Sequence, residues 1–393
     1  MFPERFSNLP AYAFPRLRAL LDVHEPGGPV MHMTIGEPRH AMPDFVTRIM
    51  AANIEGFAKY PPNDGTRGLR GAITGFLDRR YGVKLDPETQ VMPLNGTREG
   101  LYNAAMALIP EQKNGQTPAV LIPNPFYQVY MIGTMSVGAE PVFVSATRQN
   151  GYMPDYTSLP AEVLNRTAAA YICSPANPQG AVATQEYWAD LIRLAEKYDF
   201  QIFADECYSE IYRNDPPPGA MEVAAELGAD PERVVIFHSL SKRSNLPGLR
   251  SGFVAGGPES LSRIKQLRAY SGAPLPLPIQ QVSQAVWEDE AHVIDSRALY
   301  GQKYKVADQV FAGIQGYQGP EAGFFLWLPV EDGEQAALKA WTETGVRVLP
   351  GAYLSKDVIG EQNPGAGYIR VAMVAEAEEM REGLIRLRDC IYR

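Results

Sequence analysis

The sequence is short of cysteines and of long apolar runs. Only Cys173, Cys207 and Cys390 occur among its 393 residues, and their spacing fits neither a disulfide framework nor a zinc site. No stretch approaches the roughly 18 consecutive apolar residues that a transmembrane helix needs. The first residues, MFPERF, lack the basic and apolar regions of a signal peptide. We therefore expect a cytoplasmic protein that binds no membrane and no metal, with Cys207 as a buried filler.

The chain also lacks a cluster of Lys and Arg residues. Its net charge is −9, which argues against non-specific binding to nucleic acids. No G-x-G-x-x-G lies between an apolar run and a helical pattern, and there is no G-x-x-x-x-G-K-[ST]. The absence of these phosphate-binding signatures argues against a nicotinamide-dependent dehydrogenase and against a P-loop protein.

In the middle of the chain, short apolar runs alternate with the patterns of amphipathic helices. Continuous apolar runs of this length are typical of parallel strands that are covered on both faces. One helix is predicted from Thr184, a capping residue, to about Tyr198, and another starts at Thr97. This alternation predicts an α/β domain that binds ligands at the carboxyl ends of its strands. The predicted strands are residues 119–122, 168–173, 201–204, 234–237 and 251–255.

The two ends of the chain have a different pattern. The N-terminal segment is rich in proline, with one short helical pattern at 14–21. Near residue 284 a long helical pattern begins, and β-like segments follow it. A chain of this length is also too long for a single core. We predict a large α/β domain over residues 46–283 and a smaller α+β domain formed by residues 1–45 and 284–393.

Hydroxyl and cationic side chains follow the apolar run 234–237. Ser239, Ser241, Lys242 and Arg250 lie there in a loop that contains Gly and Pro. Two hydroxyls and two cations just beyond a strand favour an anion site. A lysine in such a place can act as a nucleophile when burial and nearby positive charge lower its pKa. The alternative is a solvated Ser/Lys turn, and this motif alone does not decide between the two.

A carboxylate follows another apolar run directly. Asp205 ends the segment Phe203-Ala204-Asp205 and should lie at the carboxyl end of a strand. A buried carboxylate is costly unless it is paired. A protonated pyridine nitrogen would pair it, and Asp is a known partner of the pyridinium of pyridoxal phosphate (PLP). A helix cap or a surface salt bridge is the alternative.

Four further motifs are weaker on their own. Asn177 lies in a proline-bracketed turn and can present its amide to a ligand. Gly96 and Thr97 start a helix, whose free N–H groups bind phosphate readily. Tyr127 follows a strand and can stack on a flat ring. Arg370 alternates with apolar residues, and its fork suits a carboxylate. The alternatives are an ordinary turn, simple capping, core packing and an edge-strand arginine.

Taken in order, these motifs resemble the class I and II aminotransferases, which have the PLP-dependent fold type I. The order is N-G-T, P-x-Y-x-x-Y, S-P-x-N-P-x-G, D-E-x-Y, S-x-S-K and the later arginines, from about Gly36 to Arg370. The resemblance implies a mostly parallel seven-stranded sheet between helices and a smaller α+β domain. It also implies an enzyme that moves an amino group between an L-amino acid and a 2-oxo acid.

The resemblance assigns roles to particular residues. Lys242 would carry PLP as a Schiff base and then move a proton between the amino acid's Cα and C4′ of the cofactor. Asp205 would keep the pyridine nitrogen protonated. Tyr208 and Asn177 would bind the phenolic oxygen, and Tyr127 would stack on the ring.

The remaining roles concern the phosphate and the substrate. Tyr60 resembles a tyrosine that reaches the phosphate of the neighbouring subunit, which implies a homodimer with a shared active site. Arg370, with Gly36 and Asn177, would bind the substrate α-carboxylate. The residues that would hold the phosphate are Gly96, Thr97, Ser239, Ser241 and Arg250, with Arg98 adjacent through its backbone.

The N-terminal segment gives a clue to the substrate. Residues 9–20 and 35–40 look similar to N-succinyl-L,L-diaminopimelate aminotransferases of lysine biosynthesis, in which glutamate supplies the amino group. Arg39 and His40 are candidates for binding a distal carboxylate, with a surface loop as the alternative. An alanine-, aspartate- or aromatic-type aminotransferase stays open, although no second arginine for an aspartate side chain is evident. A PLP-dependent C–S β-lyase stays open as well.

Overall fold

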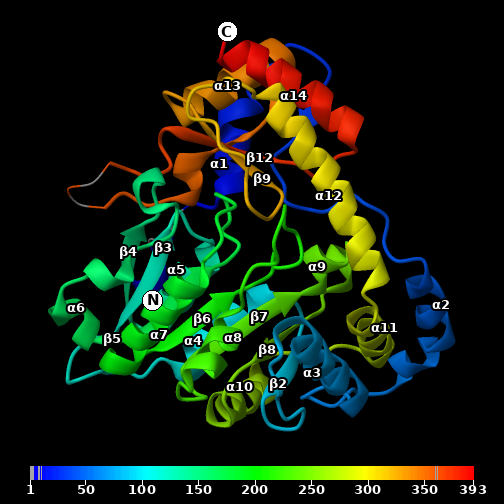
Figure 1. Ribbon diagram of the computed structural model, residues 1–393, viewed down its shortest axis with the longest axis vertical. Coiled ribbons are helices and arrows are strands. Elements are labelled where there is room, and N and C mark those ends of the chain that lie inside the picture. Colours follow the sequence, from blue (N-terminus) through cyan, green and yellow to red (C-terminus); the bar gives the residue numbers. More distant parts are fainter. Residues whose placement is uncertain (1–3, 8, 10, 359, 361) are drawn as a thin grey trace.

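The computed structural model describes residues 4–7, 9, 11–358, 360 and 362–393, so positions 1–3, 8 and 10 of the predicted N-terminal segment lie outside it. A seven-stranded sheet forms the centre of the larger part (Figure 1). Only β8 runs against its neighbours, and the other strands are parallel. In spatial order the strands are β2 (Val91–Leu94), β8 (Gly252–Ala255), β7 (Val234–Ser239), β6 (Gln201–Asp205), β5 (Thr167–Cys173), β3 (Ala119–Asn124) and β4 (Glu140–Ser145).

This arrangement confirms the predicted fold, and the five predicted strands are present. The sequence did not predict β2 and β4. β2 contains Pro93, which interrupts the strand pattern, and β4 is an edge strand whose residues are half-buried or exposed. An edge strand lacks the continuous apolar character that two covered faces impose.

Helices cover both faces of this sheet. Their apolar stripes pack against alternate residues of the strands, as in α7, where Trp188, Leu191, Ile192 and Ala195 are buried. The hydroxyl of Thr184 caps α7 by accepting from the N–H of Tyr187, which confirms the predicted start. One face carries α3 (Arg67–Tyr81), α7 (Gln185–Tyr198), α8 (Ala220–Leu227) and α11 (Leu277–Glu288). The other face carries α4 (Thr97–Leu108), α5 (Gln128–Ser136) and α10 (Pro258–Ser271).

The C-terminal part of the chain forms a second layer with its own core. Strand β12 pairs antiparallel with β9 and β11, and β1 pairs parallel with β10. The strands are β1 (Met31–His32), β9 (Phe325–Pro329), β10 (Val346–Arg347), β11 (Leu349–Pro350) and β12 (Tyr368–Ala372). The helices are α1 (Ala13–Leu21), α12 (Ala291–Val310), α13 (Gly333–Thr344) and α14 (Ala377–Ile391). Helix α1 packs on α13, so the N-terminal segment joins the C-terminal part. The domain boundaries near residues 46 and 284 stay predictions.

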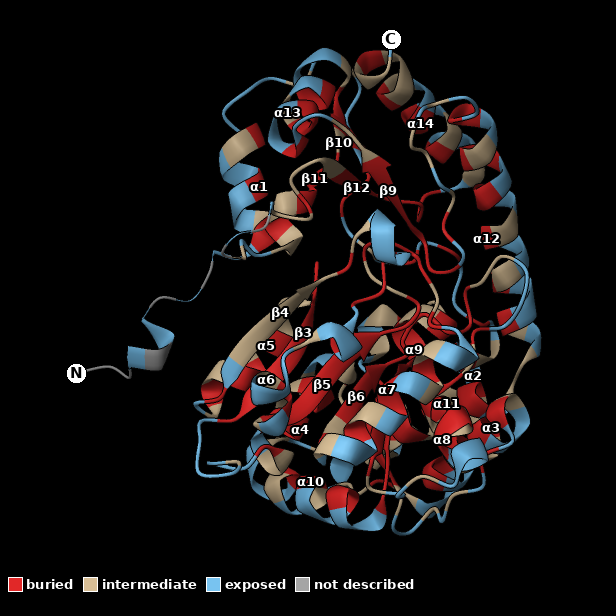
Figure 2. Cartoon of the chain, turned by 60° about the vertical axis from the view of Figure 1, so that its left-hand side comes forward, coloured by how far each residue is buried: buried red, intermediate tan, exposed pale blue. Residues whose placement is uncertain are grey.

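The long helix α12 connects the two layers, because it runs from the sheet layer to the C-terminal layer (Figure 1). Buried residues concentrate in the strands and on the inner sides of the helices (Figure 2). Of the helices within the described ranges, none combines the length and apolar character that a bilayer crossing requires. The remaining helices are α2 (Phe45–Ala52), α6 (Ala161–Asn165) and α9 (Leu240–Arg243), with 3-10 turns η1 (Glu4–Phe6), η2 (Ile54–Ala58), η3 (Arg148–Asn150), η4 (Tyr156–Ser158), η5 (Pro247–Leu249) and η6 (Gly351–Leu354).

Candidate active site

A cavity of about 260 Å³ lies at the carboxyl ends of the parallel strands. The register explains why chemistry collects there, because Cys173 of β5, Asp205 of β6 and Phe237 of β7 are aligned partners. Loops that leave these strands therefore meet at one edge of the sheet. The predicted site residues that line the cavity are Gly36, Thr97, Arg98, Tyr127, Asn177, Asp205, Tyr208, Ser239, Ser241, Lys242, Arg250 and Arg370.

Lys242 lies on α9, the short helix that follows β7 directly. The side chain of Ser239 caps this helix by accepting from the N–H of Ser241 at 3.1 Å. The Lys242 ammonium donates to the carbonyl of Gly36, and within the described residues it forms no ion pair. Burial lowers the pKa of Lys242 to about 8, and the charges of Arg370 and Arg250 act in the same direction. A lysine with a lowered pKa is a better nucleophile near neutral pH.

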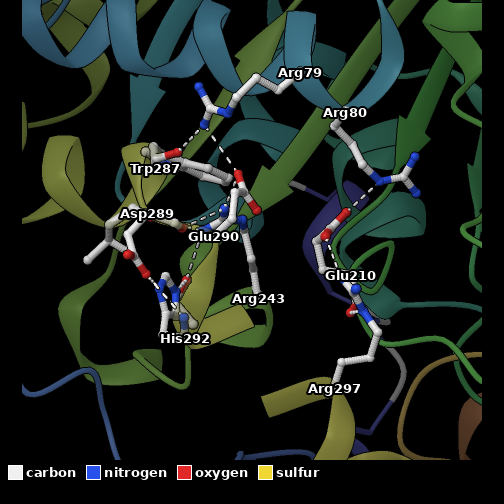
Figure 3. A network of polar contacts seen from close by, with 11 residues as sticks. Arg79, Arg80, Glu210, Arg243, Trp287, Asp289, Glu290, His292 and Arg297 are labelled. Atoms are coloured by element: carbon white, nitrogen blue, oxygen red, sulfur yellow. Dashed lines mark hydrogen bonds and ion pairs between the residues drawn. The ribbon is translucent and has the colours of Figure 1, made fainter. Parts of the chain in front are cut away.

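The residues after Lys242 anchor α9 to the junction between α11 and α12. Arg243 forms an ion pair with Glu290 at 2.9 Å, and the hydroxyl of Ser244 lies 2.8 Å from Nε2 of His292 (Figure 3). Arg243 is buried and Glu290 is half-buried, so these contacts hold the helix against the α11–α12 junction. Lys242 is therefore carried by a short but well-fixed segment.

Asp205 ends β6 and is buried. Its Oδ2 accepts from the hydroxyl of Tyr130 at 2.7 Å, and its Oδ1 accepts from the N–H of Cys207 at 3.4 Å. Burial raises the pKa of Asp205, while hydrogen bonds from Cys207 and Tyr130 oppose that shift. No cationic side chain among the described residues forms an ion pair with Asp205. A buried carboxylate with donors but no cation fits the pyridinium of PLP.

An anion cradle lies at the start of α4. Gly96 caps this helix with φ +83°, and a Cβ there would meet the guanidinium of Arg250. Glycine thus permits both the left-handed backbone and the close approach of Arg250. Arg250 also contacts the Ser241 hydroxyl at 3.4 Å. Hydroxyls, a guanidinium and free N–H groups of a helix start fit a phosphate. Gly96 itself does not line the cavity.

Arg370 lies on β12, on the opposite side of the cavity. It donates to the Asn177 amide oxygen at 3.0 Å and to the carbonyl of Thr34 at 2.8 Å, while its Nε has no partner. Burial lowers the pKa of Arg370 to about 10. Within the described residues no carboxylate pairs with it. The guanidinium therefore stays available for an incoming carboxylate. Close to it, a Cβ at Gly36 would meet the ring of Phe325.

Tyrosines and a cysteine form the rest of the wall. Tyr127 accepts from Nε of Arg98 at 2.8 Å, and Tyr208 is buried, which raises the pKa of its hydroxyl. Cys207 is buried as predicted, but it also lines the cavity, with Sγ 3.1 Å from the Thr97 hydroxyl. The interpretation of Cys207 as a mere filler is therefore incomplete. Tyr130 ends the P-x-Y-x-x-Y motif, but the sequence analysis gave it no role, although it lies three residues after Tyr127, the N-cap of α5.

Three predicted residues lie away from the cavity. Tyr60 is fully exposed in the loop after η2. Arg39 forms a surface ion pair with Glu379 at 3.3 Å. His40 is buried against the ring of Tyr300, with 4.6 Å between the ring centroids. Arg39 and His40, the candidates for binding a distal carboxylate, therefore do not line this cavity, because the loop that carries them folds toward α12 and α14, and their role stays a prediction.

Comparison with known proteins decides the family. The model of the family described as aminotransferase class I and II matches residues 28–387. The chain belongs to the class I and II aminotransferases. An LL-diaminopimelate aminotransferase of Syntrophobacter fumaroxidans is 30% identical over 99% of this chain and 98% of its own length. A crystal structure of an aminotransferase from Neisseria meningitidis superposes with a TM-score of 0.94 at 36% identity, covering 99% of each chain.

A more distant structure shares the fold alone. A probable N-succinyldiaminopimelate aminotransferase from Thermus thermophilus superposes with a TM-score of 0.83 at 22% identity, over 96% of this chain and 100% of that one. The family assignment confirms the predicted fold type I, the transaminase activity and the cofactor, PLP. When it is bound, PLP supplies an electron sink for the substrate's α-carbon. The C–S β-lyase alternative is not favoured.

Proposed function

We propose that this transaminase catalyses the exchange of an amino group between a diaminopimelate-type amino acid, either free or N-succinylated, and 2-oxoglutarate, which yields glutamate and the corresponding oxo acid, or the reverse of that exchange. Both forms carry an α-amino acid at one end and an acidic group at the other. Three of the relatives are named LL-diaminopimelate aminotransferases. The observation that carries the proposal is a pair of guanidinium groups, Arg370 and Arg98, that line one cavity without carboxylate partners among the described residues.

Arg370 is the group that we assign to the substrate α-carboxylate, with Asn177 and Gly36 beside it. Its buried fork is free at Nε and fixed by two hydrogen bonds. Lys242, whose ammonium donates to the carbonyl of Gly36, would move the proton at the α-carbon after giving up the cofactor. The lowered pKa of Lys242, caused by burial, supports this role because a neutral amine can accept that proton.

Arg98 is the group that we assign to the distal acidic end. The side chain faces solvent at the mouth of the cavity, and its Nε is held by Tyr127. That hydrogen bond raises the pKa of Arg98, so the guanidinium stays charged. The backbone of the same residue remains at the start of α4, where the phosphate is proposed to bind. One residue would thus contribute its backbone to the cofactor and its side chain to the substrate.

A panel of amino donors with 2-oxoglutarate as acceptor tests the substrate. We expect the highest kcat/KM with LL-diaminopimelate or its N-succinyl form, and the better of the two identifies the natural form. Arg98→Ala should raise KM for that donor about 10-fold and leave KM for alanine unchanged, because a charged hydrogen bond contributes about 1.5–3 kcal/mol. Arg98→Lys, which keeps the charge, is the control. Alanine, aspartate or phenylalanine as the best donor would contradict the proposal.

We also propose a cytoplasmic homodimer with shared active sites. The region around η2 supports the homodimer, because it exposes three large side chains, Ile54, Phe57 and Tyr60. Large apolar side chains that gather in one exposed region mark protein interfaces. The three free cysteines support a reducing compartment.

Mixing two variants tests the shared site. Tyr60→Ala and Lys242→Ala proteins, unfolded and refolded together, should regain roughly a quarter of the wild-type rate, because each mixed dimer contains one intact site. If Tyr60 served its own chain, mixing would restore nothing above the two parents. A monomer by light scattering would contradict the dimer directly.

A further inference from the structure

The hydroxyl of Tyr130 is directed at the carboxylate of Asp205 inside the protein. Tyr130 is fully buried on α5, and its hydroxyl donates to Oδ2 at 2.7 Å. The other carboxylate oxygen accepts from the N–H of Cys207. Each oxygen of Asp205 therefore has a donor, and only one of the two comes from the β6 loop itself. The Tyr130 contact joins α5 to the end of β6.

The ring of Tyr130 is held in place by its neighbours. It stacks on the ring of Tyr171, with 4.6 Å between centroids and 11° between planes. Tyr171 is fixed in turn, because its hydroxyl donates to the carbonyl of Leu101 at 2.8 Å. The ring of Tyr127 meets Tyr130 edge-on at 5.7 Å. With its ring packed in this way, the Tyr130 hydroxyl cannot turn away from Asp205.

A donor fixed in this way acts on the charge of the carboxylate. Burial favours the neutral acid, whereas a hydrogen bond from a hydroxyl favours the ionised form. At Asp205 burial is the larger influence and raises the pKa, with Cys207 and Tyr130 opposing it. A more basic carboxylate would withdraw the proton from a pyridinium, so the ring would lose its charge.

We propose that Tyr130 is a positioning residue that keeps Asp205 ionised and aimed at the ring nitrogen of PLP. Its hydroxyl donates to Asp205, so it acts on the cofactor through that carboxylate. The inference rests on the proposed role of Asp205, so its test must separate the failure of Tyr130 from the failure of Asp205. The chain offers a matched control in Tyr171, whose hydroxyl is equally buried and hydrogen-bonded but does not contact Asp205.

The test compares Tyr130→Phe with Tyr171→Phe. PLP is removed from each purified protein and added back, and its dissociation constant is measured by absorbance titration. We expect Tyr130→Phe to weaken PLP binding about 10-fold and to lower kcat while KM for the donor stays unchanged. Tyr171→Phe should change PLP binding less than about 3-fold. Thermal unfolding of both apo proteins reports whether either variant loses its fold.

A double mutant assigns the effect to Asp205. In an Asp205→Asn background, Tyr130→Phe should weaken PLP binding no further, because the two side chains act as one unit. Equal effects of Tyr130→Phe and Tyr171→Phe would overturn the inference about Tyr130. If Asp205→Asn itself leaves PLP binding unchanged, the role of Asp205 fails instead. If Tyr130→Phe does not fold, Tyr130→His is compared with Tyr130→Leu. The histidine can still donate a hydrogen bond to Asp205, so Tyr130→His must bind PLP more tightly than Tyr130→Leu.

Discussion

The two sides of the cavity treat their charges in opposite ways. Asp205 is buried with a donor on each oxygen and is held rigidly by Tyr130. Lys242 and Arg370 also sit away from bulk water, yet within the described residues neither has a carboxylate partner. The hydrogen bonds of Asp205 are complete before any ligand binds, whereas Arg370 has no anionic partner in the described part of the chain and gains one only when a substrate carboxylate arrives. This difference suits a bound cofactor on one side and an exchanging substrate on the other.

The most severe change should come from the acid side. Asp205→Asn keeps the shape of the side chain but removes the charge, which leaves the buried ring cation without a partner. Loss of one member of a buried pair costs about 3–5 kcal/mol, so kcat should fall about 1000-fold. Steady-state rates at saturating donor check this. A loss in kcat under about 10-fold would contradict the comparison, because substitutions on the acid side would then be no more damaging than those on the basic side.

On the basic side, Arg370→Ala should raise KM for every amino donor about 100-fold, since truncating a buried charged contact costs about 2–5 kcal/mol. The effect should not depend on the donor's side chain, because every donor carries the α-carboxylate. Arg381→Ala, on the surface helix α14, is the control and should have no effect. A donor-selective change would refute the assigned role.

The smallest effect is a pH dependence. Burial lowers the pKa of Lys242 to about 8, and only the neutral amine can capture PLP. The rate of PLP uptake by the apo enzyme should therefore rise about tenfold per pH unit below that pKa and level off above it. Stopped-flow absorbance at a fixed PLP concentration measures the profile. A rate that still climbs about tenfold per unit well above the predicted midpoint would show that the lysine is as basic as an exposed one.

The strands of the large sheet could be predicted from the sequence, because strands covered on both faces are continuously apolar. Candidate site residues were predictable where polar side chains stand at or shortly after the end of such a strand, since Asp205 ends β6 and Lys242 lies three residues after the end of β7. Side chains that act through a neighbour left a fainter signal, and Tyr130 was missed because a buried tyrosine in a helix is usually core. The position of Arg39 and His40 outside the cavity could not be predicted, because the packing of their loop depends on contacts with distant helices, which no local pattern records.

The central claim concerns Lys242, and one measurement tests it most directly. The PLP-loaded enzyme is reduced with borohydride and digested, and the peptides are analysed by mass spectrometry. Because Lys242 is the lysine that lines the cavity with a lowered pKa, the pyridoxyl label should be found on Lys242 alone. A label on another lysine, or none on the peptide that contains Lys242, would contradict the account.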